Sequence, residues 1–147
     1  MLKIDYQFKN TALLETAMTH TSYANEHRGN HLHHNERLEF LGDSVLGFVT
    51  ADYLFTHYPE LPEGDLTKLR AAVVCEGALC EIAHELGIPH EIRLGHGEET
   101  GGGRERPSIL ADATEALLGA IYLVGGMEPA RACVVRFIPH KDDVAIA

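Results

Sequence analysis

Three carboxylates share one face of a helical segment in the first third of this sequence. Glu36, Glu39 and Asp43 recur at steps of three and four, a spacing that places them along one side of an α-helix. Like charges one turn apart repel each other, so this face is suited to a bound cation. The alternative interpretation is an ordinary acidic surface whose repulsion is relieved by solvent and by Arg37.

A second pair of acids, Asp112 and Glu115, interrupts the strongly apolar segment 108–124. Carboxylates in so apolar a helix are less readily explained as surface residues, because burying an unpartnered charge is costly. Brought together with Glu39 and Asp43 by helix packing, they would form four hard oxygen donors that suit Mg²⁺ or Mn²⁺. Two such ions about 3.5–4 Å apart can activate water and stabilise a leaving oxygen, which predicts a two-metal phosphodiester hydrolysis site.

Other kinds of site remain compatible with the residues present. A di-iron helix bundle needs two Glu-x-x-His units, and only Glu81–His84 has that spacing. A Ser-His-Asp or Cys-His site is also open, although no nucleophile lies in a recognisable elbow sequence. The histidines of the polar segment 26–34 lack a cysteine or carboxylate at zinc-ligand spacing, so an exposed loop is favoured there. These histidines are His31, His33 and His34.

Helical periodicity runs through most of the chain and defines the elements that would position the acids. The pattern shows no internal repeat and no useful strand-like alternation, which predicts an all-α single domain over residues 1–138 followed by a tail at 139–147. The predicted helices cover residues 8–25, 36–57, a segment starting near Asp65, then 76–86, 108–124 and 128–138. Thr19–Tyr23 either finishes the first of these helices or starts a turn.

The predicted helix 36–57 is the longest, and Asn35 before it is a favourable N-cap. Gly42 and Gly47 inside it each cost about 1 kcal/mol relative to alanine, so another backbone or side chain is expected to approach closely there. Its apolar stripe is expected to pack in the core and consists of Leu38, Leu41, Val45 and Phe48.

Residues 88–106 break the helical pattern. Ile92 and Leu94 suggest a short extended stretch, and Gly101–Gly103 follows. The triple glycine lacks the GxGxxG and GxxxxGK[ST] frames of phosphate-binding loops, so a flexible loop is favoured. Arg104 and Arg106 beside it are candidate substrate contacts.

Composition limits the class of protein. The 147 residues, 45% hydrophobic and 23% charged, are typical of one globular domain. A net charge of -10 argues against a simple electrostatic nucleic-acid binder, so a polyanionic substrate would need divalent cations or another domain. Cys75, Cys80 and Cys133 have no CxxC spacing and are predicted to be reduced and mostly buried. With no signal peptide or long apolar run, a cytoplasmic location without membrane association is expected.

The segment Asn35-Glu-Arg-Leu-Glu-Phe-Leu-Gly-Asp-Ser44 resembles the signature of the ribonuclease III family. Ser108-Ile-Leu-Ala-Asp-Ala-Thr-Glu-Ala-Leu117 resembles the second acidic motif of that family, and it follows in the same order. Thr19–Tyr23 and Glu63–Arg70 are supporting matches, so the similarity runs over residues 8–138.

The resemblance implies an all-helical, homodimeric endonuclease domain that cuts both strands of double-stranded RNA with Mg²⁺, in rRNA or mRNA processing. It implies catalytic and metal-binding roles for Glu39, Asp43, Asp112 and Glu115, the acids already singled out by spacing. Residues with other implied roles are the auxiliary acids Glu36 and Glu63, and Phe40, which would insert into the partner subunit. Arg104 and Arg106 become candidate RNA contacts. A symmetry-related helix crossing at Gly42 and Gly47 is our hypothesis for those two glycines.

Bacterial members of the family usually carry a double-stranded-RNA-binding domain after the nuclease domain, and this chain ends where that domain would begin. The expectation is a nuclease domain from a longer protein, whose acidic charge makes RNA binding weak, metal-dependent and sensitive to salt. The alternative is an inactive relative that serves as an RNA-binding or ribosome-associated scaffold. Such a scaffold would be expected to have lost one or more of the four carboxylates, and all four are present.

Overall fold

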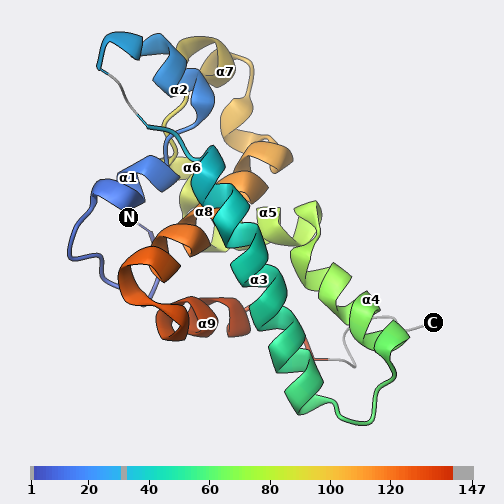
Figure 1. Cartoon of the computed structure of the whole chain (residues 1–147). Helices are drawn as coiled ribbons and strands as arrows, with labels where there is room; N and C mark the ends of the chain where they lie inside the picture. Colours follow the sequence, from blue (N-terminus) through green and yellow to red (C-terminus); the bar gives the residue numbers. More distant parts are fainter. Residues whose placement is uncertain (1, 31–32, 141–147) are drawn as a thin grey trace.

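The computed structural model describes residues 2–30 and 33–140, and over these ranges the chain is helical (Figure 1). The predicted all-α fold is therefore confirmed. His31 and residues 141–147 lie outside the described residues. The elements are α1 (Ala12–Ala17), α2 (Thr21–Glu26), η1 (Arg28–Asn30), α3 (Glu36–His57), α4 (Glu63–Val74), α5 (Glu76–Leu86), α6 (Ile88–Glu91), α7 (His96–Thr100), η2 (Gly103–Glu105), α8 (Pro107–Gly125) and α9 (Met127–Val135).

Helix α8 forms the centre of the fold. Figure 1 shows it between α3, α5 and α9, all of which pack against it. Among the described residues it is the one helix long and apolar enough to cross a membrane, yet 67% of its most apolar window is buried by the rest of the chain. Burial to this extent identifies α8 as the core helix of the domain.

Two glycines let the backbones of α3 and α8 touch. A Cβ atom at Gly42 would collide with the backbone carbonyl of Glu115, and one at Gly119 would collide with the carbonyl oxygen of Leu38. Each helix therefore needs a residue without a side chain where the other crosses it. The close approach expected at Gly42 is confirmed, but the neighbour is α8 of the same chain. The expectation of a close contact at Gly47 is not met within this chain, because a Cβ there meets nothing within 4 Å.

The face that α3 buries differs from the predicted stripe at one position. Leu38 and Val45 are buried as expected, whereas Phe48 is 56% exposed. The buried positions continue through Leu46 and Val49, because the ridge that contacts α8 follows steps of four and three residues along the helix. Phe48 lies off that ridge, and its assignment to the core was wrong.

The predicted helix 8–25 is interrupted between α1 and α2. Arg93 forms an isolated parallel bridge with Thr19: its N–H donates to the carbonyl of Met18 at 2.7 Å, and its carbonyl accepts the N–H of His20 at 3.1 Å. These bonds take the backbone groups that a continuous helix would have used.

Asn35 occupies the N-cap position of α3, but its side chain donates to the carbonyl of Ala17 at 3.2 Å and makes no capping bond.

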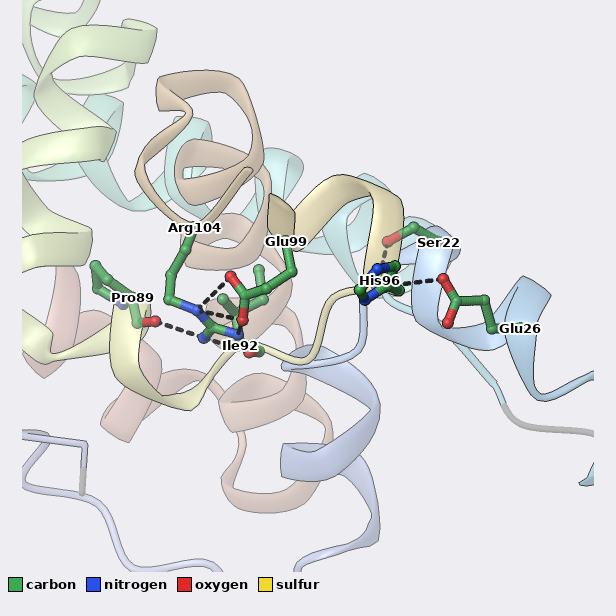
Figure 2. A network of polar contacts seen from close by, with 8 residues as sticks. Ser22, Glu26, Pro89, Ile92, His96, Glu99 and Arg104 are labelled. Atoms are coloured by element: carbon green, nitrogen blue, oxygen red, sulfur yellow. Dashed lines mark hydrogen bonds and ion pairs between the residues drawn. The ribbon is translucent and has the colours of Figure 1, made fainter. Parts of the chain in front are cut away.

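The segment predicted as a flexible loop is tightly bound to the fold (Figure 2). The Arg104 guanidinium donates to the Glu99 carboxylate and to the carbonyl oxygens of Pro89 and Ile92, both at 2.7 Å. The N–H of His96 at the start of α7 donates to the carboxylate of Glu26 in α2. These long-range contacts replace the expected loop with α6, α7 and η2, because they satisfy backbone groups that the sequence pattern leaves unpaired.

The three cysteines are free thiols with different surroundings. Cys75 is exposed and Cys80 and Cys133 are half-buried, against the expectation of mostly buried cysteines, and burial raises the pKa of the Cys133 thiol to about 11. Because the thiolate is the reactive form, we expect an alkylating reagent near neutral pH to modify the exposed Cys75 rapidly and the half-buried Cys133 much more slowly. Mass spectrometry of peptides from a time course measures both rates. Equal rates in the folded protein would contradict the burial of Cys133.

Candidate active site

The crossing of α3 and α8 brings together the two acidic pairs predicted from the sequence. Glu39 precedes Gly42 by three residues and Asp43 follows it directly, and the backbone of Glu115 lies against that glycine. One carboxylate oxygen from each of Glu39, Asp112 and Glu115 lies within 4.8 Å of the others. All four acids line one pocket, whose wall also includes Glu36 and Phe40.

Two hydrogen bonds between carboxyl groups link α3 to α8 within this cluster. Glu39 is bonded to Asp112, and Glu115 is bonded to Asp43. A bond between two carboxyl groups requires a proton on one of them. Each pair therefore joins α3 to α8 through a proton that a metal ion would replace.

Burial is the largest cause of the raised pKa values of Glu39, Asp112 and Glu115. It raises the pKa of Glu115 to about 8, with the bond to Asp43 adding to the shift, and that of Glu39 to about 7, with the charge of Asp112 adding to it. Burial also raises the pKa of Asp112. The donor set of partly buried, mutually repelling carboxylates fits a divalent cation, which prefers such oxygens and would neutralise them.

The two predicted auxiliary acids, Glu36 and Glu63, lie in different parts of the structure. Glu36 lines the same pocket as the four central acids. Glu63 begins α4, which follows the far end of α3, and it accepts a hydrogen bond from the hydroxyl of Thr67 at 2.9 Å. At 1.5 Å per residue α3 extends about 27 Å from Glu39 to its last residue, so Glu63 lies far from this pocket of its own chain.

The remaining predicted residues lie outside the group of Glu39, Asp112 and Glu115. Phe40 is 79% exposed and lines both the acidic pocket and a neighbouring, largely apolar groove that includes Leu13, Leu41 and Leu123. Arg106 forms an ion pair with Glu98 and remains half exposed. The guanidinium of Arg104 is committed to the contacts described above, so we assign it a structural role. His33 and His34 line the apolar groove.

Two residues near the site were not identified from the sequence. Gly119 lies four residues after Glu115, much as Gly42 lies three residues after Glu39. This similar spacing was a signal for Gly119 in the sequence. His20 belongs to the Thr19–Tyr23 motif, and the charges of Asp112 and Glu36 act on its imidazole. Its motif was a signal, but the position of its backbone depends on a hydrogen bond to the carbonyl of Arg93, far along the chain.

The metal-free protein is expected to lose stability as pH rises from about 4.5 to about 8. Glu39 and Glu115 have folded-state pKa values above their ordinary 4.5, so in this range the folded chain binds more protons than the unfolded chain. Stability from these groups is present at low pH and is lost as pH rises through the folded-state values. Thermal melts across this range, with a chelator and with Mg²⁺, measure the effect.

A cation that binds only the folded cluster should remove this loss of stability with rising pH. Its binding should also release protons from the cluster. Identical pH profiles with chelator and with Mg²⁺ would contradict cation binding at these acids.

The fold and site define an all-helical domain with a cluster of acidic side chains where its two longest helices cross. Residues 10–141 match the family model described as Ribonuclease-III-like. The chain therefore belongs to the ribonuclease-III-like family, whose members are metal-dependent.

Individual relatives agree with this family assignment. The chain is 49% identical over 140 residues to Ribonuclease 3 of Listeria monocytogenes and 58% identical over 124 residues to Ribonuclease 3 of Moorella thermoacetica, which cover 95% and 84% of it. It spans 61% and 52% of the lengths of these two proteins. The solved nuclease domain of ribonuclease III from Campylobacter jejuni is 46% identical, with a TM-score of 0.83 over 90% of this chain and 89% of that one. Dicer from Pichia stipitis is 26% identical, with a TM-score of 0.62 over 87% of this chain and 52% of that one.

Proposed function

We propose that residues 1–138 form the nuclease domain of an endoribonuclease that cuts both strands of double-stranded RNA by Mg²⁺-dependent phosphodiester hydrolysis. The observation that carries this proposal is the cluster of Glu39, Asp112 and Glu115, with oxygens within 4.8 Å of one another, in a chain of the ribonuclease-III-like family. Mn²⁺ is expected to substitute for Mg²⁺, because it also prefers carboxylate and water ligands. RNA processing in the cytoplasm is the corresponding cellular role.

Each of the four central acids has a part in the proposed site. Glu39 and Asp43 on α3, with Asp112 and Glu115 on α8, would hold the metal by their carboxylate oxygens. Divalent ions at such a site supply an activated water and stabilise the leaving oxygen of the phosphodiester. The backbone contact at Gly42 and Gly119 fixes the distance between the two pairs, so that the oxygens are preorganised before metal arrives. Glu36 lies in the pocket wall, where it adds negative charge without belonging to the three-acid group.

The substrate is proposed to reach an acidic protein with the help of those cations. A net charge of -10 repels RNA, and Arg104 is held within the fold. Arg106 is the half-exposed arginine beside the triple glycine and remains the candidate RNA contact of the two. Binding of a duplex by this chain should therefore require divalent cations and weaken steeply with salt.

The proposed domain acts as a homodimer, with each copy cutting one strand. Support comes from the exposed Phe40 beside an apolar groove and from the Campylobacter jejuni nuclease domain, which has structural flexibility in a region involved in dimer formation. An isologous contact would place Phe40 of each copy in the groove of the other.

Replacing Phe40 with aspartate is expected to yield a folded monomer. The side chain is exposed in the single chain, so the change should leave the fold intact while placing a charge in the apolar contact. Sedimentation equilibrium measures the mass, and circular dichroism checks the fold. Phe55→Asp, at another exposed phenylalanine of α3, serves as the matched control. A fully dimeric Phe40→Asp protein would show that the interface lies elsewhere.

The function is tested by incubating this chain with a long RNA duplex, the corresponding single strands and a DNA duplex of the same sequence. Cleavage of both strands of the RNA duplex alone, dependent on Mg²⁺ or Mn²⁺ and abolished by a chelator, is the expected result. Ca²⁺ serves as a control for binding without efficient hydrolysis. RNA binding without cleavage under all ionic conditions would support the inactive scaffold instead.

A further inference from the structure

Asn35 begins the helix that carries Glu39, but its side chain does not cap that helix. Its backbone has φ -89° and ψ -1°, in the helical region, whereas a capping residue is usually extended so that its side chain can accept the first N–H groups. The side-chain Nδ2 donates instead to the carbonyl oxygen of Ala17 at 3.2 Å, across 18 positions of sequence. The amide of Asn35 therefore serves a tertiary contact and not the start of the helix.

A second bond from Asn35 reaches the same stretch of chain. Its backbone N–H donates to the carbonyl oxygen of Thr19 at 3.0 Å. Asn35, Thr19 and Ala17 are all buried, so water cannot replace either bond. These two hydrogen bonds, which we call the Asn35 clamp, join the start of α3 to the end of α1, and Figure 1 shows these two ends side by side.

The segment that receives the clamp is itself held from a third part of the chain. The backbone of Arg93 bonds to Met18 and His20 on either side of Thr19, in the bridge described above. The guanidinium of Arg93 also donates to the hydroxyl of Thr19, and to the carbonyl oxygen of Glu15 at 3.1 Å. The two carbonyls that bind Asn35 therefore belong to a segment with its own fixed position.

The clamp lies one helical turn from the acids of the candidate site. The N–H of Glu39 donates to the carbonyl oxygen of Asn35 at 2.8 Å, which is the first hydrogen bond of α3. Glu39 thus lies between the clamp and the contact of Gly42 with α8, about 10 Å further along the helix. A helix held only where it crosses another can tilt about that contact, whereas a second fixed point sets the direction of its axis.

We propose that Asn35 is a positioning residue for the acids of the candidate site, because its clamp fixes the tilt of α3 and thereby the distance of the Glu39 carboxylate from Asp112 and Glu115. This inference rests on the proposed metal site. Ligand geometry must hold to within about 0.5 Å, so a small tilt is sufficient to weaken cation binding. The clamp thus sets cation affinity through a side chain that makes no contact with the cation.

Serine at position 35 separates positioning from capping. Serine is about as good an N-cap as asparagine, but its side chain is too short to make the bond to Ala17. Asn35→Ser therefore keeps a capping residue and removes the side-chain bond of the clamp. Leu69→Ala on α4 is the control for a general loss of stability, because Leu69 is buried with Leu54 and Tyr58 at the other end of α3.

A second variant weakens the clamp from its other side. Arg93→Met removes the bonds from the guanidinium to Thr19 and Glu15 but leaves the backbone bridge in place. Arg93 is half-buried and lies at the surface of the fold, so this variant should fold. It should weaken cation binding in the same direction as Asn35→Ser, but less, because both bonds of Asn35 remain.

The experiment measures Mn²⁺ affinity without RNA by electron paramagnetic resonance of the free hydrated ion, at a temperature well below the melting transition of each variant. Asn35→Ser is expected to bind Mn²⁺ about 10-fold more weakly than the unmodified chain. Amide hydrogen exchange at Glu39 should also be faster in this variant, because the first turn of α3 is less firmly held. Leu69→Ala should melt at a lower temperature and bind Mn²⁺ as tightly as the unmodified chain.

The possible failures are distinct. If the unmodified chain binds no Mn²⁺, or if Glu115→Gln leaves its binding unchanged, the proposed metal site itself is wrong. If Mn²⁺ binds through Glu115 but Asn35→Ser binds it equally well, the positioning role of Asn35 is overturned. Equal weakening in Leu69→Ala would also overturn it, because general stability would then decide the affinity. Should Asn35→Ser fail to fold, unchanged affinity in Arg93→Met would overturn the proposal.

Discussion

Replacing Glu115 with glutamine is expected to lower the rate of RNA duplex cleavage by about a thousandfold or more while leaving the protein folded. The substitution keeps the shape of the side chain but removes one carboxylate of the three whose oxygens lie within 4.8 Å of one another. A bound metal supplies several kcal/mol of transition-state stabilisation, and roughly 1.36 kcal/mol corresponds to each factor of ten in rate. Single-turnover cleavage with saturating protein measures the effect on the chemical step.

The same substitution should raise the melting temperature of the metal-free protein near pH 8. Glu115 has a pKa of about 8 because burial disfavours its charged form, and glutamine never carries that charge. Glu81→Gln, at an exposed acid on α5, is the matched control and should change neither cleavage nor metal-dependent stability. A Glu115→Gln protein that cleaves as fast as the control would contradict the assignment of the active site.

Replacing Gly42 with alanine is expected to destabilise the fold by about 3 kcal/mol or more. The new methyl group would collide with the backbone carbonyl of Glu115, which cannot move aside as a flexible side chain can. Relief requires α3 and α8 to separate, so the acidic pairs they carry should also move apart, and residual folded protein should lose Mg²⁺ binding. Urea denaturation followed by circular dichroism measures the free energy of unfolding.

Gly47→Ala, five residues further along α3, is the matched control. Its Cβ would meet nothing within 4 Å, so alanine there should stabilise the helix by about 0.5–1 kcal/mol through lower chain entropy in the unfolded state. Equal effects of the two substitutions would show that helix propensity, rather than the crossing, decides the cost at Gly42. Strong destabilisation at Gly47 alone would place that residue against another copy of the chain.

Local periodicity was sufficient to predict the long helices and to identify the acids of the candidate site. The bounds predicted for 36–57 and 76–86 are those of α3 and α5, and the two acidic pairs predicted from spacing line one pocket. Both results follow from properties of short segments, since residues three or four apart share a helix face whatever surrounds the helix. The chemistry of the acids likewise identified divalent cations as suitable ions for these carboxylates, because hard cations prefer oxygen ligands in any fold.

Interactions between distant segments determined the features that local periodicity did not predict. The break at Thr19 depends on Arg93, and the ordering of the segment around Arg104 depends on the carbonyls of Pro89 and Ile92. Phe48 was misplaced because the buried face of α3 is set by the direction in which α8 crosses it. None of these contacts leaves a local signal, because the groups involved are far apart in the chain.

The amino-acid sequence by itself determined that this protein is helical and that Glu39, Asp43, Asp112 and Glu115 are its candidate metal ligands, because helical spacing and residue chemistry are local. Only the tertiary structure decided that Gly42 and Gly119 bring those acids together and that burial raises the pKa values of Glu39 and Glu115. Distance, burial and electrostatic coupling arise when α3 packs against α8, and no isolated segment possesses them.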